Sequence, residues 1–170
     1  MAKVVISHRL HDDGMAVLEN AGVDVVITNS GDPKVMLPEL KDADGVIIRI
    51  GSIDRETMEQ CPKLKVIGRP GVGVDDVDVE AAIELGIPVV IAPGANSRSV
   101  AEHAMAMMFA CAKDMMRSDR EMRKGNFGIR SSYKAYELGG KTLGLLGYGH
   151  IGSIFAGMAE IGRASCRERV

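Results

Sequence analysis

A glycine-rich turn near residue 150 has the residue types and spacing that suit a bound pyrophosphate. Gly147, Gly149 and Gly152 form the pattern GxGxxG after the apolar run 142–146 and before the helix-compatible run 153–159. In a strand–turn–helix unit of this kind, the first glycine allows the tight turn, the second lets the backbone approach a pyrophosphate, and the third lets the helix pack closely. The free N–H groups at the start of the helix then attract phosphate.

A second glycine-containing segment lies upstream, where Gly71, Val72 and Gly73 follow an apolar run. Two interpretations fit these residues alone. The glycines can serve a turn that needs a positive φ, or the loop can turn its backbone N–H groups toward a substrate carboxylate. Because Pro70 has no N–H group, any donors in this loop must begin at Gly71.

Two arginines, Arg49 and Arg69, end two predicted strands. The carboxyl ends of the strands form the edge at which open α/β sheets bind ligands. A planar guanidinium can donate two parallel hydrogen bonds to a carboxylate or a phosphate. The arginines therefore indicate an anion site, although solvent-exposed surface arginines fit the sequence as well.

The elements that must position these residues alternate between short apolar runs and helical stretches. Apolar runs without strict alternation are typical of a parallel sheet covered on both faces. The runs are 4–6, 23–27, 45–48, 66–67 and 89–91, and the predicted helices lie near 12–20, 33–42, 54–60 and 78–85. This order predicts an α/β protein that begins with a flavodoxin-like, doubly wound parallel sheet.

A long helix is predicted from Ser99 to about Lys124. Ser99 and Glu102 have the spacing of a capping box. The first half, to Ala112, is apolar nearly all round and should be buried on several sides, whereas the second half is charged and should face water. We expect His103 to be packed rather than catalytic.

Four segments together resemble the D-2-hydroxyacid dehydrogenase family, and within it the phosphoglycerate dehydrogenase-like members. They are residues 48–52, 68–78, 96–103 and 138–152, and they occur in the family's order and at its spacing. The resemblance implies an NAD-dependent oxidoreductase that moves a hydride between nicotinamide and C2 of a 2-hydroxy or 2-keto acid.

The resemblance also implies a domain organisation. Residues 1–97 would form the substrate domain, and residues 98–159 would hold the linking helix and the truncated start of a Rossmann NAD-binding domain. In the family, this helix and the loop after it contribute to a dimer interface, so a homodimer is expected.

Residue roles are implied in the same way. The substrate-binding positions would be Arg49, Arg69, Gly71, Val72, Gly73 and Asn96. The cofactor-binding positions would be Ser99, Gly147, Gly149, His150, Ile151 and Gly152, with the backbone of His150 along the pyrophosphate. The pair of arginines favours a substrate with a second anionic group, such as 3-phosphoglycerate.

The family's catalytic Arg, Glu and His, and the acid that holds the cofactor ribose, lie downstream of the glycine turn. We therefore expect no catalytic residue in this chain, and the choice between NAD and NADP stays open. Residues 160–170 read EIGRASCRERV. They can be back-translated to a DNA string that resembles a sequencing adapter. We expect a truncated, inactive fragment with a non-native tail, so Glu168 is not assigned to the ribose.

Composition bounds the class of protein. A net charge of −2 gives no bulk attraction to nucleic acid or to an anionic membrane. The longest apolar run, 104–112, is too short to span a bilayer, and no signal-peptide pattern is present. Cys61, Cys111 and Cys166 have no metal-ligand spacing, so no metal site is expected. The expectation is a cytoplasmic protein with a small-molecule acid as its partner.

Two other classes of function fit parts of the sequence. A phosphoacceptor receiver domain would share the alternation of strands and helices and the acidic pair Asp12 and Asp13. Arg49 stands where its phosphorylated aspartate should be, and residues 92–94 lack its lysine, which disfavours that class. An NAD-sensing corepressor of the same family stays open, because the motifs present do not separate it from an enzyme.

Overall fold

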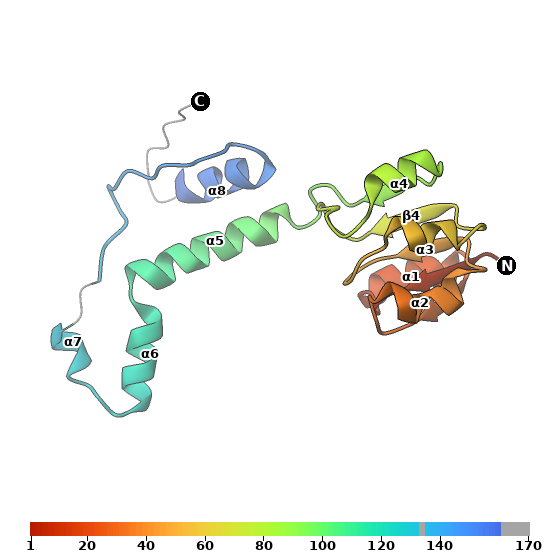
Figure 1. Ribbon diagram of the computed structural model, residues 1–170. Helices are drawn as coiled ribbons and strands as arrows, with labels where there is room; N and C mark the ends of the chain where they lie inside the picture. Colours follow the sequence, from red (N-terminus) through yellow and green to blue (C-terminus); the bar gives the residue numbers. More distant parts are fainter. Residues whose placement is uncertain (133–134, 161–170) are drawn as a thin grey trace. The chain divides into compact units, whose positions relative to one another are not determined.

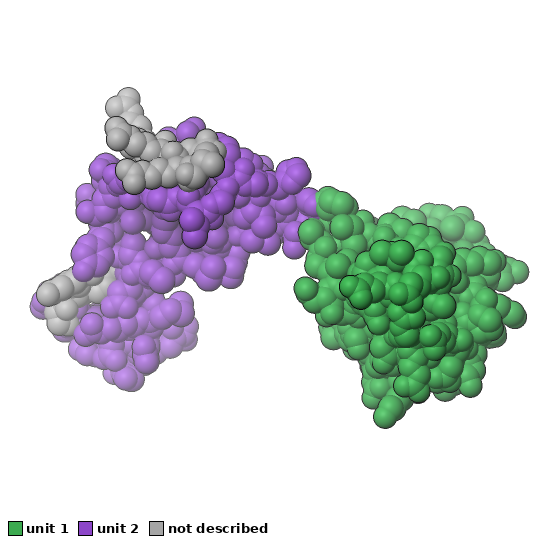
Figure 2. Space-filling view, turned by 45° about the horizontal axis from the view of Figure 1, so that its top comes forward, with its two compact units in different colours: residues 1–93 green, residues 94–170 purple. Residues whose placement is uncertain are grey.

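The computed structural model describes residues 1–132 and 135–160. The chain divides into two compact units, Met1–Pro93 and Gly94–Val170, which Figure 2 shows in separate colours. The domain boundary expected after residue 97 stays a prediction. The tail expected at 160–170 lies outside the described residues, except for Glu160, which ends a helix.

The first unit is built on a sheet of five parallel strands in the order β2-β1-β3-β4-β5. The strands are β1 (Lys3–Ile6), β2 (Asp24–Ile27), β3 (Gly45–Ile47), β4 (Val66–Arg69) and β5 (Val89–Ile91). They overlap the predicted apolar runs, and their order confirms the doubly wound α/β fold. The order reverses between β1 and β3, so the carboxyl ends of these two strands form the edge at which a ligand is expected.

Four helices connect the strands (Figure 1): α1 (Asp12–Asn20), α2 (Pro33–Leu40), α3 (Arg55–Glu59) and α4 (Val79–Glu84). The side chains of Asp32, Asp54 and Asp78 each accept a backbone N–H from the first turn of a helix. These caps satisfy donors that have no partner inside the helix. Thr57 donates both its hydroxyl and its N–H to Asp54, which lowers the pKa of that carboxyl.

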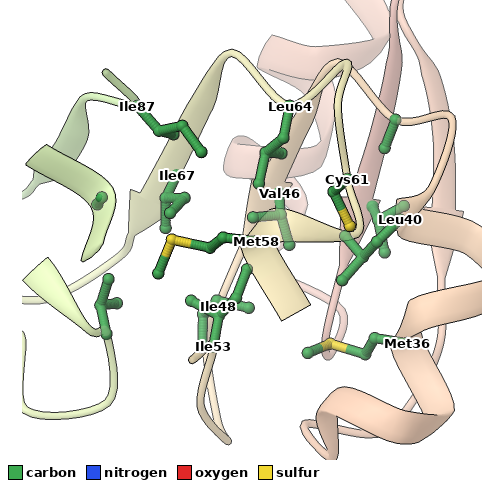
Figure 3. Packing of buried hydrophobic residues seen from close by; sticks show 14 of the residues in the cluster. Met36, Leu40, Val46, Ile48, Ile53, Met58, Cys61, Leu64, Ile67 and Ile87 are labelled. Carbon is green, nitrogen blue, oxygen red and sulfur yellow. The ribbon is translucent and has the colours of Figure 1, made fainter. Parts of the chain in front are cut away.

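The core of the first unit lies between the sheet and helices α2, α3 and α4, and Figure 3 shows its packing. Met36 of α2 and Met58 of α3 pack in the same cluster as Val46 and Ile67 of the sheet, and each is at most 2% exposed. Burial of such apolar side chains is the main stabilising contribution. Cys61 belongs to this cluster, and burial raises the pKa of its thiol.

The second unit is helical over most of its described residues. Its helices are α5 (Ser97–Ala112), α6 (Met115–Arg123), α7 (Ile129–Ser132) and α8 (His150–Glu160). The prediction of one continuous helix from Ser99 to Lys124 is wrong, because the chain breaks at Asp114, which has a left-handed φ of 46°. The change from apolar to charged residues therefore falls between two helices rather than between two halves of one.

The capping box predicted from Ser99 and Glu102 is absent. The helix begins at Ser97 with Asn96 at its N-cap. Glu102 accepts a hydrogen bond from Arg98 Nε at 3.0 Å instead. Arg98 and Glu102 are four positions apart, so they are neighbours on the exposed helix surface and form an ion pair. This pair takes the place of the capping hydrogen bond that was predicted for Glu102.

The predicted burial of α5 is also wrong. Helix α8 packs against α5, and Phe155 of α8 is buried. Met107 and Phe109 of α5 stay 51% and 45% exposed, and His103 is exposed rather than packed. Within the described residues, α5 has cover from α8 along part of its surface only.

The strand predicted at residues 142–146 does not form in the part of the chain that the structure describes. A parallel strand is stable only when a neighbouring strand takes up its N–H and C=O groups. Within this run, only Leu143 forms an isolated bridge, and the five-stranded sheet contains none of its residues. The apolar composition of the run is therefore not sufficient to make it a strand.

The loops after β2 and β3 approach each other so closely that both need a glycine. Gly51 has a φ of 107°, and a Cβ added to it would overlap the backbone of Gly31. The Ser52 N–H donates to the Gly31 carbonyl at 3.1 Å across the same contact. This contact holds the turn that follows β3 and that includes Arg49.

Replacing Gly51 with alanine should destabilise the first unit by about 3 kcal/mol or more, because the left-handed φ and the backbone overlap both disfavour the new Cβ. Gly22→Ala is the matched control, since Gly22 has a φ of 65° but open space around its Cβ position. It should cost about 1 kcal/mol. Urea unfolding followed by far-UV circular dichroism measures both variants. Equal losses would contradict the close approach.

Candidate functional site

The carboxyl ends of β1 and β3 lie side by side where the strand order reverses. Val5 pairs with Val46, and Ile6 pairs with Ile47. The residues that follow these strands, Ser7 and Arg49, therefore meet at the point where open α/β sheets bind ligands. The structure places Arg49 at the edge that the sequence predicts.

Ser7 holds the backbone of Arg49 at this edge. Its side chain is fully buried, and its hydroxyl accepts the N–H of Arg49 at 2.9 Å and that of Ile50 at 3.3 Å. A buried hydroxyl with two backbone donors fixes a turn that the strand ladder does not reach. Sequence reasoning missed Ser7, although a small polar residue directly after the apolar run 4–6 was an available signal.

The Arg69 guanidinium makes three hydrogen bonds to other parts of the chain. Its Nη2 lies 2.7 Å from Asp76 Oδ2. Its Nη1 donates to the carbonyls of Ile48 and Arg49 at 3.3 and 3.0 Å. The side chain is 20% exposed, and its buried Nε has no partner among the described residues. Arg69 thus stands at the predicted edge of the sheet. Its hydrogen bonds connect the segment after β3 with Asp76 and leave few donors for a substrate anion.

Arg49 has different surroundings. Its side chain is exposed, and its Nη1 donates to the carbonyl of Arg9 at 3.3 Å. No carboxylate pairs with Arg49 among the described residues, whereas the neighbouring Arg9 pairs with Asp12 at 2.9 Å. A guanidinium has five N–H donors. Arg49 therefore keeps donors that can bind an anion at the sheet edge.

The loop 71–73 adds backbone donors beside Arg69. The Gly71 N–H donates to the Arg69 carbonyl at 2.7 Å. Val72 and Gly73 are exposed, and their N–H groups have no acceptor within the described ranges. The free donors thus begin at Val72 rather than at Gly71. Neither glycine of the loop has a positive φ, so the interpretation as a turn that requires one is wrong.

The second unit holds Asn96 and Ser99 at the start of α5. Asn96 stands at the N-cap, where its side chain makes no capping hydrogen bond. Ser99 lies in the first turn of the helix rather than at the cap, which corrects its predicted structural role. Both side chains are exposed, so their polar groups are open to a ligand.

The glycine turn before α8 has a conformation that suits a phosphate. Gly147 has a φ of 96°, and a Cβ added to Gly152 would overlap the Gly147 carbonyl. The close approach is therefore within the turn rather than against a strand. Gly149 has open space around its Cβ position, and His150 and Ile151 at the helix start are exposed. The N-terminus of α8 is accessible to a pyrophosphate.

The candidate ligand-binding groups of each unit are drawn from arginine side chains, exposed polar side chains and backbone N–H groups. Within residues 1–132 and 135–160, no three His, Cys, Asp or Glu side chains are grouped so that they could hold a metal ion. In the same part of the chain, no helix is both long and apolar enough to cross a bilayer.

Known relatives match nearly the whole chain. Residues 4–165 match the family model of the D-isomer specific 2-hydroxyacid dehydrogenase catalytic domain. D-3-phosphoglycerate dehydrogenase of Methanocaldococcus jannaschii is 43% identical over 153 residues, which cover 89% of this chain and 29% of that relative. The enzyme of the same name from Archaeoglobus fulgidus is 34% identical over 151 residues, which cover 88% of this chain and 28% of that relative. This chain thus spans less than a third of the length of these relatives.

Solved structures agree with the sequence relatives. D-lactate dehydrogenase from Aquifex aeolicus, in complex with NAD and lactic acid, matches 95% of this chain and 49% of its own, with a TM-score of 0.81 and 29% identity. NAD-dependent formate dehydrogenase from Staphylococcus aureus, in complex with NAD, matches 97% of this chain and 55% of its own, with a TM-score of 0.81 and 27% identity. These relationships exclude the receiver-domain class. The chain belongs to the D-isomer specific 2-hydroxyacid dehydrogenase family.

Proposed function

We propose that the chain is part of an NAD-dependent oxidoreductase that acts on the CH–OH group of a D-2-hydroxy acid, as phosphoglycerate dehydrogenases do. One observation carries the proposal: a chain of this family combines a cationic sheet edge after β1 and β3 with an open glycine turn before α8. The first suits an acidic substrate, and the second suits a dinucleotide pyrophosphate. The names of the sequence relatives and the structures solved with NAD support both halves.

Arg49 is the residue that we assign to the anionic group of the substrate. Its guanidinium is exposed and has no carboxylate partner among the described residues. The N–H groups of Val72 and Gly73 supply further donors. Asn96, which belongs to the second unit, stays a predicted substrate residue. Arg69 stays a predicted substrate residue, although its bonds to Asp76 and to two carbonyls favour a supporting role.

The cofactor is assigned to the start of α8. The pyrophosphate would lie against Gly147, Gly149, His150, Ile151 and Gly152, with Ser99 also close to the cofactor. The bound nicotinamide supplies the hydride acceptor. The residues of this chain contribute binding and orientation. The turn accepts the pyrophosphate of NAD or of NADP, and the relatives solved with NAD favour NAD.

The acid/base chemistry is assigned to residues outside this chain. The family's catalytic Arg, Glu and His are expected downstream of the glycine turn, so the 170-residue chain alone should be inactive. Residues 142–146 do not form a strand, so no sheet anchors the glycine turn. We therefore expect the 170-residue chain to bind the cofactor weakly. A homodimer and a cytoplasmic location stay predictions.

The complete reading frame of the gene should yield an enzyme that reduces NAD with D-3-phosphoglycerate, and the 170-residue chain should show neither turnover nor micromolar affinity for NAD. Absorbance of the reduced cofactor measures the first, and calorimetry measures the second. D-glycerate and D-lactate test whether the second anionic group matters. A frame without the downstream Arg, Glu and His that binds NAD without turnover would favour the corepressor.

In the complete enzyme, Arg49→Ala should raise the KM for the hydroxy acid about 10- to 150-fold, because the loss of a charge-assisted hydrogen bond costs about 1.5–3 kcal/mol. The KM for NAD should stay unchanged. Arg9→Ala is the matched control, since it removes the same charge from the same edge but takes it from a guanidinium paired with Asp12. Steady-state kinetics gives the KM values of the unaltered enzyme, of Arg49→Ala and of Arg9→Ala. Equal effects of the two substitutions would reduce the role of Arg49 to general electrostatic attraction.

A further inference from the structure

The backbone N–H and C=O of Arg49 are each hydrogen-bonded to a side chain. Its N–H donates to Ser7 Oγ at 2.9 Å, and its carbonyl accepts from Arg69 Nη1 at 3.0 Å. Strand β3 ends at Ile47, so the ladder does not supply these bonds. The direction in which the exposed Arg49 side chain leaves the sheet edge therefore depends on Ser7 and Arg69.

Asp76 in turn fixes Arg69 and the loop that follows it. Its Oδ2 accepts from Arg69 Nη2 at 2.7 Å. Its backbone carbonyl accepts the N–H of Ile53 at 2.9 Å, and the Asp78 N–H donates back to Ile53 at 3.0 Å. Asp76 thus connects the segment after β3 with the end of the loop that carries the donors of Val72 and Gly73.

We propose that Asp76 is a positioning residue of the substrate site, which acts through Arg69 to hold Arg49 and the donors of loop 71–73 in the arrangement that binds the anion. The inference rests on the proposed function, because it takes Arg49 as the anion-binding residue. The carboxylate itself does not contact the substrate. The Asp76 carboxylate orients the Arg69 guanidinium. Arg69 in turn orients the backbone of Arg49, and so the direction of the Arg49 side chain.

The sign of the effect separates positioning from simple electrostatics. A carboxylate beside an anion site repels the anion, so its removal strengthens binding if charge alone matters. Loss of positioning weakens binding instead, since small displacements of binding groups are costly. Asp75 is the matched control, because it is the adjacent carboxylate, is exposed, and has no hydrogen-bond partner within the described residues. Asp76→Asn removes the charge but keeps an oxygen acceptor for Arg69.

The test is a titration of the 170-residue chain and its variants with D-3-phosphoglycerate, in which binding is monitored through the backbone amide resonances by NMR. Asp76→Ala should weaken binding about tenfold, and Asp76→Asn should stay within about threefold of the unaltered chain. Asp75→Ala should bind as tightly as the unaltered chain or slightly more tightly. Tighter binding by Asp76→Ala, or equal weakening by Asp76→Ala and Asp76→Asn, would overturn the positioning role.

A second readout needs no ligand. The amide resonances of Arg49 and Ile50 should shift in Asp76→Ala and stay in place in Asp75→Ala, with the rest of the sheet unchanged in both. If the unaltered chain does not bind D-3-phosphoglycerate but these resonances shift, the proposed substrate site fails and the connection through Arg69 stands. If binding occurs and the resonances do not shift, the positioning role fails and the proposed function stands.

Discussion

The parallel pairing of β1 with β3 is the constraint on which the proposed substrate site depends. Their register sets Ile6 opposite Ile47 and brings the buried Ser7 hydroxyl to the N–H of Arg49. A shift of one residue would exchange the two faces of the strand and would remove the hydroxyl from that position. The apolar cluster of Val46 and Ile67 with the methionines of α2 and α3 fixes the register, since it buries one face of the sheet. Core packing and ligand geometry are thus set by the same pairing.

The sequence was sufficient to predict the first unit because its signals are local. Runs such as 4–6 and 89–91 are β-branched and apolar, and three of the four helices between them begin after an aspartate that caps them. The arginines could be placed at the sheet edge because each ends a run. Their division of roles could not be predicted, since it arises from Asp76, a residue that only the folded loop brings to Arg69. Ser7 was missed for a similar reason, because a serine after a strand is usually a loop residue.

The second unit shows where local signals are not enough. Ser99 and Glu102 have the spacing of a cap, yet the helix starts at Ser97, and the glutamate pairs with Arg98. The run 142–146 has the composition of a strand, but a strand exists only with a partner. The glycine turn differs, because Gly147 and Gly152 meet within a few residues and need no distant segment. Local signals thus predicted the glycine turn. They failed where the helix began two residues earlier than the cap signal and where a strand needed a distant partner.

The unequal pairing of the arginines determines how an anion reaches the sheet edge. Arg69 is neutralised by Asp76 and Arg9 by Asp12, which leaves Arg49 as the arginine of this edge without a carboxylate partner in the described residues. The whole chain has a net charge of −2. The field of one unpaired cation is screened within about 8 Å at physiological ionic strength. For the proposed function, the encounter with a hydroxy acid is therefore governed by ordinary diffusion rather than by long-range steering. Differences in affinity among substrates should arise in their dissociation rates.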